Sequence, residues 1–351
     1  MTTFVQSRDV QQILDNLGLH FIERFAERRV LVSGGLGFLG RYFAAVFQAM
    51  NDGPLQGREV EVRLVDNCIA SGAAAAPKPT RWITSLKADV AELREPYGGL
   101  DYVLHCAGIA SPFYYRRFPL ETVDAALSVR SVLEVARRNA GCRVAFFSSS
   151  EIYGDPDPKH VPTPESYRGN VSCLGPRSVY DESKRMGETL VRAYQQQYGV
   201  HGTIIRPFNV YGPGMQHTDY RVLPNFAAHI LKDEPVRAYG DGRQTRTYCY
   251  VSDAIGGFLR VLLDGIAGEP YNIGNPTPEI SVLDLARTIG RVLERDIKID
   301  VVEHPDSYPA DEPQRRCPDI TKARTLGYEP KVGLEEGLAR FFAWAKEAYP
   351  K

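Results

Sequence analysis

The stretch Gly34-Gly-Leu-Gly-Phe-Leu-Gly40 decides the fold of this chain. It follows the apolar run Val30-Leu-Val32 and precedes Arg41-Tyr-Phe-Ala-Ala-Val-Phe47, which is typical of a helix. A strand, a glycine-rich turn and a helix start in this order predict a pyrophosphate site, because the free N–H groups and the positive dipole end of the helix face the anion. The spacing is G-x-x-G-x-x-G, not the commoner G-x-G-x-x-G, and a plain turn is the alternative.

The three glycines of the G-x-x-G-x-x-G spacing have separate predicted tasks. Gly34 allows the tight turn, Gly37 lets the backbone approach the phosphates, and Gly40 lets the helix pack against the strand. These tasks are those of a dinucleotide-binding loop.

A carboxylate follows this loop at the end of the next expected strand. Glu61-Val-Arg-Leu-Val-Asp66 ends roughly 20–30 residues past the glycines, where an acid binds the ribose hydroxyls and repels a 2′-phosphate. We therefore expect NAD and not NADP, the alternative for Asp66 being a turn or helix N-cap residue. Asp89 follows a third short apolar stretch and is a second candidate, on the adenine side.

The composition predicts a soluble globular protein of one large or two smaller domains. The chain has 351 residues, 43% of them hydrophobic and 24% charged, with a net charge of −1. This balance gives no reason to expect a nucleic acid or an anionic membrane as partner, and no apolar run approaches the length of about 18 residues that spans a bilayer. The N-terminus does not resemble a secretory signal.

Cysteine and histidine usage points away from metal binding. The six cysteines form no C-x-x-C pair, and the seven histidines form no spaced ligand cluster. We expect reduced thiols in a cytoplasmic protein without a metal site.

Apolar strands alternate with helices along the first two thirds of the chain. Strands are predicted at 102–107, 143–148 and 202–206, and helices at 120–139 and 182–198. This alternation predicts an α/β fold, a doubly wound parallel sheet of the Rossmann type.

The same pattern divides the chain into three predicted parts. Residues 1–28 form a helical extension that packs on the domain surface or, alternatively, contacts a second subunit or covers the site. Residues 29–210 form the NAD-binding Rossmann domain, with a flexible Ala/Pro-rich loop at 70–79. Residues 211–351 mainly form a smaller α/β substrate lobe, with some segments returning to the Rossmann domain.

Tyr180-Asp-Glu-Ser-Lys184 is the only Tyr-x-x-x-Lys in the chain. At i and i+4 of a helix the two side chains share a face, so the lysine is expected to lower the pKa of the phenol, which then takes a hydroxyl proton while hydride leaves for NAD⁺. A surface Tyr–Lys pair is the alternative. The serines at 148–150 end a buried strand, where active sites of open α/β sheets lie, and Ser149 is expected to hydrogen-bond the reacting oxygen.

With these motifs the chain resembles the extended short-chain dehydrogenase/reductase family from residue 29 to its end. The segments that carry the resemblance are Ser33–Gly40, His105–Gly108, Arg206–Pro213 and Tyr239–Arg246. It implies that Asn209 touches a nucleotide sugar and that Arg246 grips its diphosphate. It also implies a cofactor site that includes Phe38, Leu39, Asn67, Val90 and Ala107.

Within that family the finer resemblance is to UDP-glucuronate decarboxylases. The segments that carry it are Ser149–Pro156, Pro164–Asn170, Gly175–Arg185, Asp219–Phe226 and Asp311–Asp319. Two departures are Ser149, where those enzymes usually carry threonine, and His-Cys-Ala-Gly-Ile-Ala-Ser-Pro at 105–112, where they usually carry His-Leu-Ala-Ser-Pro-Ala-Ser-Pro.

This finer resemblance implies further roles. Ser150 and Glu151 stand beside the C5–C6 end of the sugar, Arg316 holds a carboxylate or phosphate, Arg221 helps to bind the cofactor, and Tyr115 binds substrate. A homodimer is also expected from it.

The expected reaction is NAD-dependent decarboxylation of UDP-glucuronate to UDP-xylose through a 4-keto intermediate. A UDP-sugar 4-epimerase is the alternative, since it uses the same oxidation but leaves Glu151 idle. A 4,6-dehydratase usually has an aspartate where Ser150 stands. A silent NAD-binding protein is disfavoured because Tyr180, Lys184 and Ser149 are all present.

Overall fold

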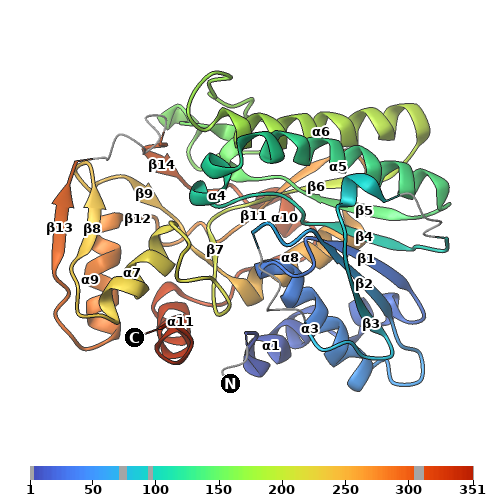
Figure 1. Cartoon of the computed structure of the whole chain (residues 1–351), viewed down its shortest axis with the longest axis horizontal. Helices are drawn as coiled ribbons and strands as arrows, with labels where there is room; N and C mark the ends of the chain where they lie inside the picture. Colours follow the sequence, from blue (N-terminus) through green and yellow to red (C-terminus); the bar gives the residue numbers. More distant parts are fainter. Residues whose placement is uncertain (1–3, 71–76, 94–97, 304–311, 351) are drawn as a thin grey trace.

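A seven-stranded parallel sheet forms the centre of the molecule (Figure 1). The computed structural model describes residues 4–70, 77–93, 98–303 and 312–350. The strand order is β11-β6-β5-β4-β1-β2-β3. The strands are β1 (Arg29–Ser33), β2 (Glu61–Asp66), β3 (Ile83–Lys87), β4 (Tyr102–His105), β5 (Arg143–Phe147), β6 (His201–Pro207) and β11 (Pro270–Ile273).

The order of the strands reverses at β1, which places a cleft at their carboxyl ends. β1 pairs with β2 on one side and with β4 on the other, so that Ser33 lies level with both Val65 and His105. Connections that leave such a switch point in opposite directions open a crevice there, and ligands of open α/β sheets bind in it.

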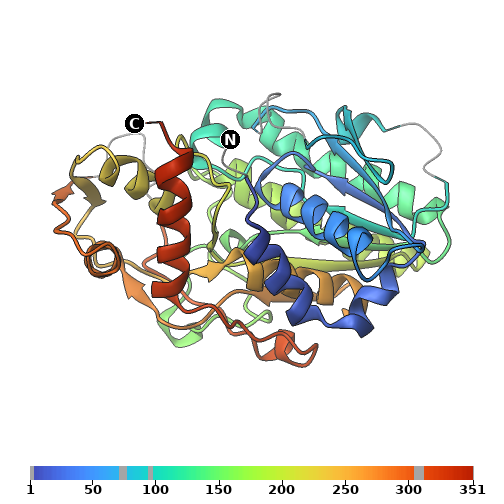
Figure 2. The ribbon, with the colours of Figure 1, turned by 90° about the horizontal axis from the view of Figure 1, so that it is seen from below.

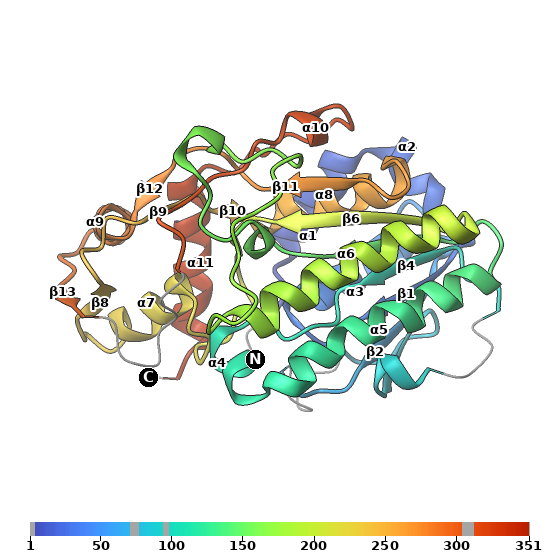
Figure 3. The same ribbon diagram turned by 90° about the horizontal axis from the view of Figure 1, so that it is seen from above.

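Helices cover both faces of the sheet. On one face α5 (Pro119–Arg138) and α6 (Ser178–Tyr198) lie side by side (Figure 3). On the other face α3 (Phe38–Asp52) and α8 (Val251–Asp264) pack against the strands. The near-continuous apolar strands are explained by this double cover, because both of their faces are buried.

The N-terminal extension forms an outer layer over α3 and α8 (Figure 2). Its helices are α1 (Ser7–Leu17) and α2 (Leu19–Ile22), separated by Gly18, and a short 3₁₀ turn, η1 (Glu23–Phe25), follows. The apolar face of α1 is buried, and its Asp9 accepts hydrogen bonds from the hydroxyls of Tyr42 and Tyr250. The extension is therefore tied to the body by buried polar contacts as well as by apolar packing.

The second lobe is built around short strand pairs. β14 pairs in parallel with β9, which brings Arg316 level with Arg246 although the two are far apart in sequence. The strands outside the main sheet are β7 (Val210–Tyr211), β8 (Val236–Tyr239), β9 (Thr245–Arg246), β10 (Cys249–Tyr250), β12 (Ile280–Ser281), β13 (Ile299–Val302) and β14 (Arg315–Arg316). The remaining helices are α4 (Pro112–Arg117), α7 (Val222–Ile230), α9 (Val282–Val292), α10 (Thr321–Arg324) and α11 (Leu334–Ala348).

The predicted fold class, a doubly wound parallel sheet, is confirmed. The helix predicted from residue 182 begins four residues earlier, at Ser178, and so includes Tyr180. β11 and α8 belong to the C-terminal part of the chain but lie in and on the main sheet, while the domain division near residue 210 stays a prediction. Residues 71–76 of the expected loop lie outside the described residues.

Across the described ranges, no helix has the length and apolar character needed to cross a membrane. Within the same ranges, no cluster of three or more His, Cys, Asp or Glu side chains is arranged to hold a metal ion.

Candidate active site

A cavity of about 540 Å³ opens at the carboxyl ends of β1, β2, β4 and β5. Most of the side chains singled out in the sequence line it, from the glycine loop at one end to the strand-end serines at the other. The predicted residues in its wall are Gly34, Gly37, Phe38, Leu39, Gly40, Asp66, Asn67, Asp89, Val90, Ala107, Ser149, Ser150, Glu151, Tyr180, Lys184, Asn209 and Arg221. Tyr115, Arg246 and Arg316 lie outside that wall.

The glycine loop is packed so closely that side chains at two of its glycines would collide with backbone atoms. Gly34 has φ +66°, and a Cβ there would lie 2.8 Å from the backbone nitrogen of Ala107. At Gly40 a Cβ would collide with the backbone of the loop itself. Gly37 is the N-cap of α3, and the first residues of that helix line the cavity. A narrow backbone cradle at a helix N-terminus fits a dinucleotide pyrophosphate.

Asp66 holds the backbone around it and also faces the cavity. Its carboxylate accepts hydrogen bonds from the backbone nitrogens of Leu36, at 2.9 Å, and Cys68, at 2.8 Å, and it also lines the cavity. Asp89 accepts a hydrogen bond from the side chain of Asn67 at 3.1 Å. Three predicted polar residues thus stand at the same end of the cavity, where ribose binding stays a prediction.

Tyr180 and Lys184 share one buried face of α6 beside the end of β5. The Lys184 ammonium donates a hydrogen bond to the carbonyl of Phe147 at 2.8 Å and lies 5.8 Å from the centre of the Tyr180 ring. Ser149 is the next residue but one after Phe147, and its hydroxyl accepts a hydrogen bond from the Glu151 backbone nitrogen at 3.2 Å. The structure therefore brings the predicted hydroxyl, phenol and ammonium groups together.

Burial decides the proton affinities of this pair. It raises the pKa of Tyr180 to about 12, although a hydrogen bond with Ser149 acts in the opposite direction. Burial also lowers the pKa of Lys184 to about 8. The charges of Glu151 and Asp181 act in the same direction as burial, and the expected effect of Lys184 on the pKa of Tyr180 stays a prediction.

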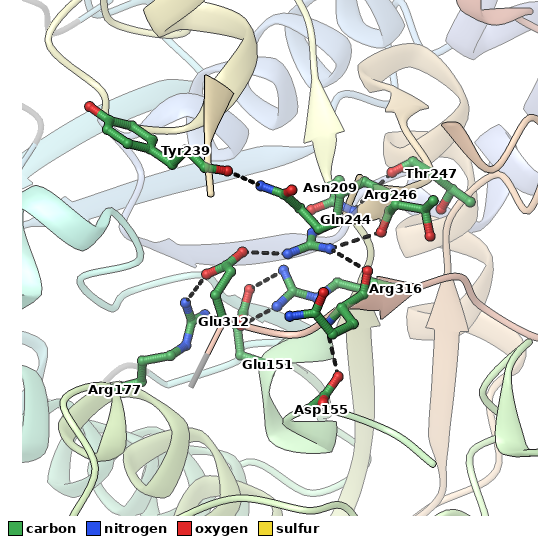
Figure 4. A network of polar contacts seen from close by, with 12 residues as sticks. Glu151, Asp155, Arg177, Asn209, Tyr239, Gln244, Arg246, Thr247, Glu312 and Arg316 are labelled. Carbon is green, nitrogen blue, oxygen red and sulfur yellow. Dashed lines mark hydrogen bonds and ion pairs between the residues drawn. The ribbon is translucent and has the colours of Figure 1, made fainter. Parts of the chain in front are cut away.

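A buried network of charges begins at Glu151 and extends into the second lobe (Figure 4). Glu151 is paired with Arg316, at 2.5 Å, and with Arg177. Glu312 in turn accepts hydrogen bonds from Arg177, at 2.6 Å, and from Arg246. Burial favours the neutral form of Glu312, but the charges of Arg246 and Arg177 prevail and lower its pKa. Both carboxylates are bridged by Arg177.

Arg177 and Glu312 are the site residues that the sequence analysis missed. Both lie in segments that carry the family resemblance, but neither received a role. Arg177 is three residues before Tyr180, at the start of the same helix. That spacing puts the two side chains on neighbouring positions and is the signal that would have identified it. Glu312 carries no comparable local pattern, since its partners come from other elements.

Three further residues predicted to bind substrate or cofactor lie outside the charge network. Tyr115 is buried, and its ring stacks on that of Tyr180 with 5.6 Å between centroids. Its hydroxyl is among the buried polar atoms that make no hydrogen bond within the described residues. Asn209 has φ +39° and donates to the carbonyl of Thr247 at 2.9 Å. Arg221 is paired with Asp219 on the cavity wall.

Comparison with known proteins agrees with this geometry. Residues 30–274 match the model of the NAD dependent epimerase/dehydratase family. UDP-glucuronic acid decarboxylase 5 of Arabidopsis thaliana is 39% identical over 315 residues, covering 88% of this chain and 87% of the relative. UDP-glucuronic acid decarboxylase 1 of Xenopus tropicalis is 37% identical, covering 91% of this chain and 72% of the relative.

Solved structures share the fold over most of its length. A dTDP-glucose 4,6-dehydratase from Streptomyces venezuelae, with NAD and TYD bound, has a TM-score of 0.78 at 27% identity and covers 91% of this chain and 97% of its own. A UDP-glucose 4-epimerase from Thermotoga maritima, with UDP-glucose, has a TM-score of 0.78 at 25% identity, covering 92% of this chain and 100% of its own.

Proposed function

This chain belongs to the NAD dependent epimerase/dehydratase family, and we propose that it decarboxylates UDP-glucuronate to UDP-xylose with NAD as cofactor. The relatives that carry the name UDP-glucuronic acid decarboxylase match most of the chain and support this reaction over others of the family.

The residues of the cavity wall fit the cofactor. The glycine loop and the start of α3 would hold the pyrophosphate, and Asp66 with Asn67 and Asp89 would hold the adenosine half. The nicotinamide would then lie toward Ala107, Tyr180 and Lys184 at the other end. When bound, NAD⁺ accepts a hydride from C4 of the sugar and returns it at the end of the cycle.

Tyr180 is the proposed base for the first step. It takes the proton of the C4 hydroxyl, and Ser149 hydrogen-bonds the same oxygen as it becomes a ketone. Lys184 lies beside Tyr180 and donates to the carbonyl of Phe147, and its positive charge is proposed to favour the phenolate that accepts the hydroxyl proton. The resulting ketone is β to the carboxylate.

The β-keto acid loses its carboxylate as CO₂, because the C4 ketone accepts the electron pair of the breaking C5–C6 bond as an enolate. A proton then adds at C5, and hydride return at C4 gives UDP-xylose. Ser150 and Glu151 follow Ser149 directly and are the proposed neighbours of C5 and C6. Arg316, paired with Glu151, is the proposed partner of the departing carboxylate.

The network of arginines and glutamates has an excess of positive charge, and this excess is the observation that carries the proposal of an anionic sugar as substrate. Arg177, Arg246 and Arg316 contribute three positive charges, while Glu151 and Glu312 contribute two negative ones. Asp181 lies 3.9 Å from Arg177, but burial and the charge of Glu151 raise its pKa, so its negative charge is weakened. A site with excess positive charge suits a substrate that has a carboxylate beside its diphosphate.

The test is to incubate the purified protein with NAD⁺ and UDP-glucuronate labelled with ¹³C at C6, and to follow the products by NMR. Labelled CO₂ and unlabelled UDP-xylose, the latter seen by its protons, are expected, and the Tyr180→Phe variant should form neither. UDP-galacturonate without CO₂ would reassign the chain to a 4-epimerase. No turnover would reject UDP-glucuronate as substrate.

The proposal includes a homodimer formed through α5 and α6. Leu120, Val123 and Leu127 form one exposed apolar row on α5, and Met186 is exposed on the neighbouring α6. Exposed apolar rows on adjacent helices favour association with a second copy. We also propose a cytoplasmic location, which the six free cysteines support.

A further inference from the structure

The segment before α1 brings an aromatic ring to the cofactor cavity. Phe4 lines the cavity together with Gly37 and Gly40, although it lies far from them in sequence. Its ring covers the guanidinium group of Arg41, with 4.1 Å between the Cζ carbon of Arg41 and the ring centre. The ring also lies against Gly214, where an added Cβ would stand 2.4 Å from the Cε1 atom of Phe4.

The two segments next to Phe4 are each held by a polar contact. α1, which follows Phe4 in the chain, is anchored through Asp9, which is buried and paired with Arg340 at 3.3 Å. The loop around Gly214 is held by Tyr42, whose hydroxyl donates to the carbonyl of Pro213 at 3.1 Å. Phe4 therefore fills the gap between the start of α3 and that loop.

Arg41 supplies charge at the same place. It directly follows Gly40 in the first turn of α3, and its Nε donates to the carbonyl of Leu36 at 2.7 Å. Burial lowers the pKa of Arg41 to about 10 while Asp66 acts in the opposite direction, so the side chain is charged at neutral pH. A guanidinium group beside a phosphate-binding loop matches phosphate oxygens in shape and charge.

We propose that Phe4 and Arg41 close the pyrophosphate side of the cofactor cavity and slow the release of NAD. The inference rests on the proposed NAD-dependent function, in which the cofactor that takes the hydride must be the one that returns it. A ring that covers Arg41 in the cavity wall shields the guanidinium group from water, and desolvation strengthens cation–π and phosphate interactions. The N-terminal extension would thus let one NAD serve many turnovers.

The experiment measures NADH release directly. Full-length protein is loaded with NADH and mixed with excess NAD⁺ in a stopped-flow instrument, and the loss of bound NADH fluorescence gives the dissociation rate. We expect Phe4→Ala to release NADH about tenfold faster than the unchanged protein, which corresponds to about 1.4 kcal/mol. Phe4→Tyr, which keeps the ring, should restore slow release.

Phe21→Ala is the matched control. Phe21 lies in the same N-terminal extension and covers Arg260 at 4.3 Å, but it is not in the cavity wall. It should leave the rate unchanged. Equal release rates for Phe4→Ala and the unchanged protein would overturn the inference and leave the proposed function standing. If the unchanged protein bound no NADH at all, both would fall.

Discussion

Ser149 connects the predicted base to the predicted carboxylate end of the site. Its hydroxyl accepts from the backbone of Glu151, and its hydrogen bond with Tyr180 lowers a pKa that burial has raised. Ser149→Ala removes that lowering, so the pKa of Tyr180 rises further and less phenolate is present at neutral pH. We expect kcat/KM at pH 7 to fall about 100-fold and the rising limb of its pH profile to move to higher pH.

Ser149→Thr is the control for that prediction. It keeps the hydroxyl and installs the residue usual in the decarboxylases that the chain resembles. Its pH profile should coincide with that of the unchanged protein. An unshifted limb in Ser149→Ala would show that the hydroxyl does not tune Tyr180.

Arg177 is the second residue tested, and its removal is expected to lower the stability of the protein. It is buried and bridges Glu151 and Glu312, so Arg177→Met leaves two partly buried carboxylates with one cation fewer. We expect the free energy of unfolding to fall by about 2–3 kcal/mol in urea denaturation. The cost comes from the lost ion pairs of Arg177 with two carboxylates that each keep one arginine partner, and not from lost apolar packing.

A double-mutant cycle separates these two causes. Glu312→Gln removes one of the carboxylates that Arg177 neutralises. The double variant should therefore lose less stability than the sum of the two single variants. Strict additivity would mean that the ion pair contributes little.

At the scale of elements, the position of α6 depends on its close packing against β5. Gly187 lies on α6 directly over the ring of Phe146, and a Cβ there would collide with that ring. Gly187→Ala must push the helix away from the sheet, and the helix carries both Tyr180 and Lys184. We expect a loss of about 1–3 kcal/mol in stability together with reduced kcat, measured by thermal unfolding and by the UDP-xylose assay.

Gly256→Ala on α8 is the matched helix substitution. Gly256 is also buried, but no atom lies within 4 Å of its added Cβ. Since alanine favours helix by about 0.5–1 kcal/mol over glycine, this variant should be as stable as the unchanged protein or more so. A similar loss of stability in both variants would mean that the helices tolerate no such substitution anywhere, and that the contact between α6 and β5 is not special.

At the scale of the whole molecule, the exposed row on α5 makes the oligomeric state testable. Leu127 is 59% exposed, and Leu127→Arg places a charge in the proposed interface with α6 of a second copy. We expect light scattering after gel filtration to show a monomer. Leu19, 58% exposed on α2 at the other side of the sheet, gives the control Leu19→Arg, which should remain a dimer.

Much of the fold and one half of the site were predictable because their signals are local. The glycine loop, the carboxylate of Asp66 and the Tyr180–Lys184 pair are each contained in one strand–turn–helix or helix segment. The topology of a parallel sheet then brings strand ends to one edge, so local motifs become neighbours.

The sequence by itself determined the doubly wound sheet, because apolar periodicity and glycine spacing act over a few residues. Only the tertiary structure decided the charge network and the cover on the cofactor cavity. Arg246 and Arg316 meet through the pairing of β9 with β14, and Phe4 reaches Arg41 through the docking of α1. The proton affinity of Tyr180 was likewise decided by burial, which depends on every element packed around it and is written in no single segment.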